Sequence, residues 1–184
     1  AYNDDYRFRP DPVLLCNIPA DGDYVLEVKD AIYRGREDFV YRLSAGELPF
    51  VTSMFPLGGP ARAKTAVQVS GWNLPTGTVT MDASGAGPGT AMLTVRRGTL
   101  VSNRVPFAVD SVRDVLEREP NDGIGNAAKL TLPVIVNGRI QAAGDVDVYA
   151  IIGRAGEPII AEVTARRLGS PLDSVVELTD AAGT

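Results

Sequence analysis

The residues best suited to chemistry are acidic and amide side chains in the last third of the chain. They are Glu117, Glu119, Asn121, Asp122, Asp145 and Asp147. Carboxylate and amide oxygens are the ligands of calcium, which takes about six to eight of them. An extended backbone places Glu117 and Glu119 on one side, and Pro120 favours that geometry at Glu119. Asp145 and Asp147 share one face of an expected strand. The pattern predicts a calcium site.

A simpler interpretation of the same residues stays open. Asn121 and Asp122 could only cap a turn, and Asp145 and Asp147 could lie in a solvated loop. Near the start of the chain there is a second acidic set, for which an exposed turn is a better interpretation than a metal site. Its members are Asp4, Asp5 and Asp11.

Nothing in the sequence assembles into a catalytic site. The chain has no histidine, the commonest general base, and one cysteine, Cys16. Cys16 lies in an apolar run and lacks a histidine partner, so we expect a small buried side chain and not a nucleophile. The lysines, Lys29, Lys64 and Lys129, form no Ser-x-x-Lys arrangement. We therefore expect no catalytic residues, no organic cofactor and no enzyme activity.

Composition narrows the class of protein further. A net charge of -5 disfavours nucleic acid as a partner, since phosphates need lysine and arginine. There is no apolar stretch long enough for a membrane-spanning helix. The 19 glycines and 13 prolines leave little room for long helices. Because the chain begins at Ala1 and not with methionine, we expect a processed or excised piece of a longer protein, so the missing signal peptide does not indicate the cytoplasm.

The elements that must position the acidic residues are short strands between glycine- and proline-rich turns. Apolar residues alternate with polar ones in three segments, 1–48, 49–110 and 111–184. The expected strands span 13–18, 24–28 and 39–43, then 66–70, 78–82, 91–96 and 105–109, then 134–140, 146–152, 159–164 and 174–179. A single helical turn is expected at 126–128. We expect an all-β fold of β-sandwich modules, with Tyr24, Phe39 and Tyr41 in a core.

The third segment opens with an expected linker at 111–119 and resembles the N-terminal half of the bacterial pre-peptidase C-terminal domain, a jelly-roll-like β-sandwich. The matching residues are Glu117-Arg118-Glu119-Pro120-Asn121-Asp122, Gly138-Arg139-Ile140, Gly144-Asp145-Val146-Asp147-Val148-Tyr149, Gly156-Glu157, Gly169-Ser170-Pro171-Leu172-Asp173-Ser174 and Leu178-Thr179-Asp180-Ala181-Ala182-Gly183. In the collagen-binding relatives of that family, residues matching the six named above bind calcium and brace the linker against the sandwich.

The other two segments carry resemblances of their own. Segment 1–48 resembles the C-terminal half of the same family, and segment 49–110 is similar to the immunoglobulin-like fold of IPT/TIG modules. The first match rests on Asn3-Asp4-Asp5, Pro19-Ala20-Asp21-Gly22-Asp23-Tyr24-Val25-Leu26-Glu27-Val28 and Phe39-Val40-Tyr41-Arg42-Leu43. The second rests on Val51-Thr52-Ser53-Met54-Phe55-Pro56-Leu57-Gly58-Gly59 and Val67-Gln68-Val69-Ser70-Gly71-Trp72-Asn73-Leu74.

These resemblances imply an accessory region of a secreted, cell-surface or periplasmic bacterial protein, serving in adhesion, substrate targeting or spacing. A polymeric protein or a carbohydrate is the expected ligand. The alternative is structural assembly, in which residues 111–184 of one copy complete the half-sandwich of residues 1–48 of another by strand exchange. Pairing of the two halves within one chain also remains open.

Overall fold

The computed structural model describes residues 1–7, 9–180 and 182–183, in two compact units, residues 1–47 and 48–184. The described residues form short β-strands and two 3-10 turns, with no α-helix. The expected all-β, sandwich-type fold is confirmed. No helix in the described part of the chain has the length and apolarity needed to cross a bilayer.

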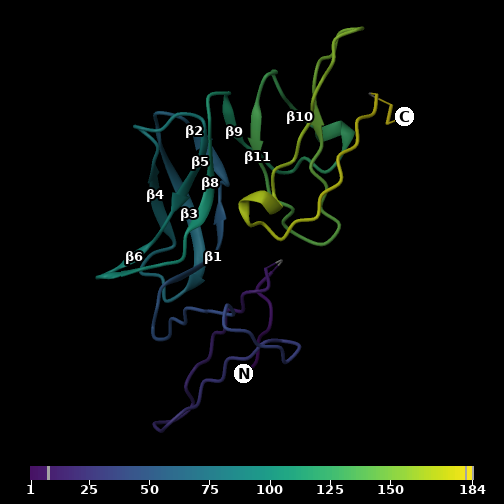
Figure 1. Ribbon diagram of the computed structural model, residues 1–184. Coiled ribbons are helices and arrows are strands. Elements are labelled where there is room, and N and C mark those ends of the chain that lie inside the picture. The colour runs from purple at the N-terminus through teal and green to yellow at the C-terminus, as the bar shows by residue number, and fades with distance from the viewer. Residues whose placement is uncertain (8, 181, 184) are drawn as a thin grey trace. The chain divides into compact units, whose positions relative to one another are not determined.

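A two-sheet sandwich occupies the start of the second unit (Figure 1). One sheet is antiparallel and holds β1 (Phe50–Phe55), β3 (Lys64–Trp72) and β4 (Thr78–Asp82). In the other, β8 (Val105–Asp110) lies between β2 (Gly58–Pro60) and β5 (Gly89–Leu93). Since β1 and β2 belong to different sheets, the chain crosses from one sheet to the other at residues 56–57. A short hairpin of β6 (Arg96–Arg97) and β7 (Leu100–Val101) follows β5.

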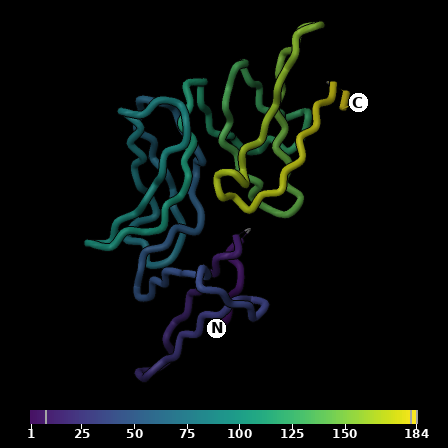
Figure 2. Tube along the Cα trace, in the orientation of Figure 1, coloured from purple at the N-terminus to yellow at the C-terminus, as the bar shows by residue number. Residues whose placement is uncertain are grey.

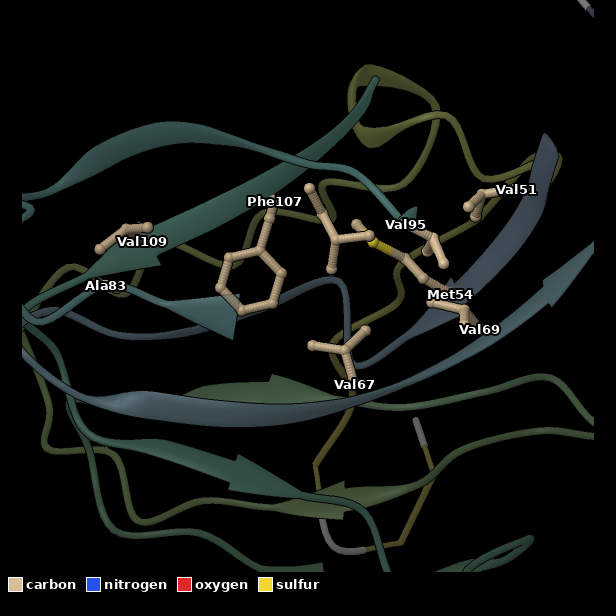
Figure 3. Packing of buried hydrophobic residues seen from close by; sticks show 9 residues of the cluster. Val51, Met54, Val67, Val69, Ala83, Val95, Phe107 and Val109 are labelled. Carbon is tan, nitrogen blue, oxygen red and sulfur yellow. The ribbon is translucent and has the colours of Figure 1, made fainter. Parts of the chain in front are cut away.

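Alternation of apolar and polar residues builds the core between these sheets. Val67 and Val69 of β3 are buried while Gln68 between them is exposed, as period-two geometry requires. From the other sheet, Phe107 is fully buried and points toward Val67 (Figure 3). The remaining buried members are Val51, Met54, Ala83, Leu93, Val95 and Val109. The strands expected at 66–70, 78–82 and 105–109 are confirmed because a second sheet covers their apolar faces.

The rest of the second unit adds two small parallel ladders beyond β8. β9 (Asp114–Leu116) pairs with β11 (Ile135–Asn137), and β10 (Ala128–Lys129) pairs with β12 (Tyr149–Ala150). The 3-10 turns are η1 (Ile124–Asn126) and η2 (Arg166–Leu168). Thus the strands expected at 134–140 and 146–152 are shorter than predicted, and the helical turn lies two residues earlier.

Several expected strands do not form. In the described residues of 1–47 the one β-bridge joins Tyr6 to Arg9, and no ladder forms at 13–18, 24–28, 39–43, 159–164 or 174–179. The trace of residues 9–47 runs as extended stretches joined by turns (Figure 2). A strand needs a hydrogen-bonded neighbour and a covering layer, and these segments lack both.

The burial expected in the first unit is therefore wrong. Tyr24, Phe39 and Tyr41 are 54%, 40% and 73% exposed, and Cys16 is exposed as well. Their alternating positions would bury them only against a second sheet.

Candidate metal centre

Three carboxylates converge in the last segment of the chain. Glu117 and Glu119 follow β9, and Asp147 lies two residues before β12. One ligand oxygen from each of the three lies within 4.8 Å of the others. A single cation that contacts oxygens at about 2.3–2.6 Å could reach all three.

Asn121 lies beside this cluster with its side chain fully buried. Its exposed fraction is 0%, and neither its Nδ2 nor its Oδ1 has a hydrogen-bond partner. In the described part of the chain, the other buried side-chain polar atom without a partner is Asp147 Oδ1. The Asn121 amide lies close enough to lower the pKa of the Asp147 carboxyl, but the two side chains do not reach normal hydrogen-bond geometry. Buried polar atoms without a partner are costly, so their presence on two neighbouring side chains calls for a further partner, which a bound ion or a water molecule can supply.

Gly138 forms the floor of the same site. A Cβ at this position would lie 2.6 Å from Glu117 Oε2 and 3.0 Å from both Asp147 Oδ2 and the Tyr149 hydroxyl. No side chain fits there without displacing these oxygens. Glycine therefore keeps open the space on which the two carboxylates and the phenol converge.

Backbone and amide donors hold the carboxylates in place. Glu119 Oε2 accepts from the Asn121 backbone N–H at 2.9 Å, and Glu119 Oε1 accepts from Gln141 Nε2 at 3.1 Å. Glu117 Oε2 accepts from the Arg139 backbone N–H at 2.8 Å. These donors fix the orientation of the oxygens but neutralise none of their charge, since each donor is itself uncharged.

Partial burial and neighbouring negative charges raise the pKa values of Glu117, Asp147 and Tyr149. Burial raises the pKa of Glu117, and the Asp147 charge raises it further, against the Arg139 N–H. Burial also raises the pKa of Asp147, with the charge of Asp145 adding to it. The pKa of Tyr149 lies far above its usual range because of burial and the adjacent carboxylates. A cation would relieve this repulsion.

The predicted ligand set is thus brought together in part. Glu117, Glu119 and Asp147 cluster, and Asn121 lies against them. Asp145 lies outside the cluster and accepts a hydrogen bond from the Gln141 backbone N–H. Asp122 is exposed and is not part of the cluster. The second acidic set, Asp4, Asp5 and Asp11, for which an exposed turn is the better interpretation, is exposed and forms no group of described residues that could hold a metal.

Sequence reasoning missed Gly138, Arg139, Gln141 and Tyr149 as parts of the site. Tyr149 carried a usable signal, because it lies two residues after Asp147 on one face of an expected strand. The others depend on β11 lying beside β9, which no local pattern indicates.

The donor set is made of oxygen alone and suits a hard cation such as calcium or magnesium. No family model, curated protein or solved structure matches this chain.

Proposed function

We propose that this chain is a non-catalytic accessory region of a secreted or cell-surface bacterial protein, with its last segment braced by calcium. The observation that carries the proposal is the fully buried, unpartnered Asn121 amide beside Glu117, Glu119 and Asp147. Three carboxylates and an amide oxygen would give a hard cation four protein ligands, and water would complete the shell.

Calcium fits this arrangement better than magnesium. Magnesium demands near-ideal octahedral geometry, keeps several waters and is usually bound through one or two carboxylates. Calcium accepts irregular geometry and more protein oxygens, which suits three carboxylates and an amide drawn from separate stretches of the chain. Extracellular modules bind calcium with dissociation constants of about 0.1–1 mM, which suits the proposed location.

Bracing follows from where the ligands lie in the chain. Glu117 and Glu119 belong to the stretch that leaves β9, whereas Asp147 precedes β12. One ion bound by all three would tie that stretch to the second ladder. Such a brace fixes how the region spaces and presents neighbouring parts of a longer protein, with a polymeric protein or a carbohydrate as its ligand.

Differential scanning calorimetry tests the metal part of the proposal. We expect the melting temperature of the chain in EDTA to rise with added calcium, and less with equimolar magnesium. Glu117→Gln should abolish the rise, whereas Glu27→Gln, an exposed carboxylate outside the cluster, should preserve it. A melting temperature that does not respond to calcium rejects the metal part of the proposal.

A second candidate function is assembly by strand exchange. Val25, Ile160 and Val175 are each more than nine-tenths exposed, and all three lie in extended stretches without a ladder. Unpaired extended segments with apolar side chains favour pairing with another strand. If residues 111–184 of one copy pair with residues 1–48 of another, head-to-tail rings or filaments result. Light scattering decides: a compact monomer up to high concentration excludes intermolecular exchange.

A further inference from the structure

We infer that the tripeptide Asn137–Arg139 couples the metal centre to the sandwich, so that metal binding and the joint between them stabilise each other. The inference rests on the proposed cation site and goes beyond it. In it, residues 137–139, which are not metal ligands, regulate the affinity of the site for the metal.

Asn137 hydrogen-bonds to the backbone next to residues 56–57, where the chain crosses from one sheet of the sandwich to the other. Its side chain is 8% exposed, and Oδ1 accepts from the backbone N–H groups of Leu57 and Gly58 at 3.1 and 3.2 Å. Its Nδ2 donates to Asp114 Oδ1 at 2.7 Å. One side-chain amide thereby joins β2, β9 and β11.

The Arg139 side chain contacts the other sheet of the sandwich, formed by β1, β3 and β4. Its guanidinium donates to Gln68 Oε1 at 2.6 Å and lies 3.7 Å from the centre of the Phe55 ring. Phe55 ends β1 and Gln68 is its register partner on β3. The two contacts therefore act on one cross-strand pair.

Between these two side chains, the backbone faces the metal centre. Side chains two residues apart in an extended chain share one face, and the residue between them faces the opposite way. Gly138 accordingly has the oxygens of Glu117 and Asp147 on its open side. The Arg139 N–H donates to Glu117 Oε2 at 2.8 Å, and the Asn137 carbonyl accepts from the Glu117 N–H at 3.0 Å. Glu117 is thus hydrogen-bonded to the same backbone segment whose Asn137 and Arg139 side chains contact the sandwich.

Two consequences follow from this arrangement. An ion that fixes the Glu117 carboxylate restrains the backbone of the tripeptide and strengthens both contacts with the sandwich. By linkage, the factor by which the ion strengthens a contact with the sandwich equals the factor by which that contact strengthens ion binding, so removing the contact must weaken metal binding by that factor.

Calorimetric titration of the full chain with calcium chloride tests this reciprocity. Gln68→Ala removes one contact without a change of charge, and Ser70→Ala, an exposed residue two positions along β3, is the matched control. We expect Gln68→Ala to raise the calcium dissociation constant about fivefold, at the low end of typical coupling between sites, and Ser70→Ala to leave it unchanged.

Arg139→Ala separates coupling from simple electrostatics. Loss of a positive charge near a cation site should by itself tighten calcium binding, whereas loss of coupling weakens it. We expect weaker binding, together with slower hydrogen exchange at the Leu57 and Gly58 amides when calcium is added to the unsubstituted chain.

The outcomes distinguish the two proposals. If the unsubstituted chain binds no calcium, the cation site and the coupling both fail. If it binds calcium, but Gln68→Ala and Arg139→Ala bind as tightly and the two amides exchange at the same rate with and without the ion, only the coupling is overturned.

Discussion

Replacing Asn121 by alanine should have different effects on the metal-free and the calcium-loaded protein. The buried polar atoms of the Asn121 side chain have no hydrogen-bond partner of normal geometry within the protein. In the proposed calcium-loaded protein, the Asn121 Oδ1 would supply a ligand to the ion. Truncation therefore removes a defect in one state and a metal contact in the other.

The magnitudes follow from the two environments. An unsatisfied buried polar group costs about 1–3 kcal/mol, which its removal recovers. The small cavity left behind costs a similar amount, so we expect metal-free stability to change by less than about 1 kcal/mol. Calcium at about 100 times its dissociation constant contributes about 2.7 kcal/mol, and a tenfold loss of affinity removes about half of that.

Thermal unfolding in EDTA and in calcium measures both effects. We expect Asn121→Ala to melt within about 3 °C of the parent chain in EDTA and to show about half of the calcium-induced rise. Asn121→Asp, which keeps an oxygen at the same place, should recover the rise. The reasoning is refuted if Asn121→Ala loses several kcal/mol in EDTA while its response to calcium stays intact.

Three further predictions address the site and the fold. Gly138→Ala should abolish calcium binding, measured by titration calorimetry, because the new Cβ displaces the Glu117 and Asp147 oxygens. Calcium binding as tight as in the parent chain would contradict the role given to Gly138. Burial raises the folded-state pKa values of Glu117 and Asp147 above their unfolded-state pKa values of 4.5 and 3.8. The stability that these two carboxyls contribute to the metal-free protein is therefore fully present below pH 3.8, and it is lost as the pH rises through the folded-state pKa values. The calcium-induced stabilisation should grow over the same pH range, and parallel pH profiles in EDTA and calcium would argue against this assignment. Phe107→Ala, at a fully buried core position, should cost about 3–5 kcal/mol in chemical denaturation, and a loss below about 1 kcal/mol would place Phe107 outside the core.

The sandwich strands could be predicted from sequence because their partners are present. Alternation predicted residues 78–82, and β4 spans Thr78–Asp82. The same alternation at residues 24–28 and 39–43 yields no ladder, since periodicity indicates which face would be buried and not whether a second sheet exists.

The candidate site shows the same division between local and long-range information. The i, i+2 spacing of Glu117 and Glu119 is local, and it correctly placed both carboxylates on one side. The Asn121 backbone pairs with a distant part of the chain next to Asp147, because its carbonyl accepts from the Val148 N–H at 2.9 Å. Sequence spacing suggested Asp145 and Asp147 equally, and only the fold separates them.

Anomalous diffraction from crystals grown with calcium, or with terbium in its place, tests the central claim most directly. The account predicts one strong peak within coordination distance of the Glu117, Glu119 and Asp147 carboxylates and of Asn121 Oδ1. A water molecule hydrogen-bonded to Asn121, with no anomalous signal at that place, would contradict it.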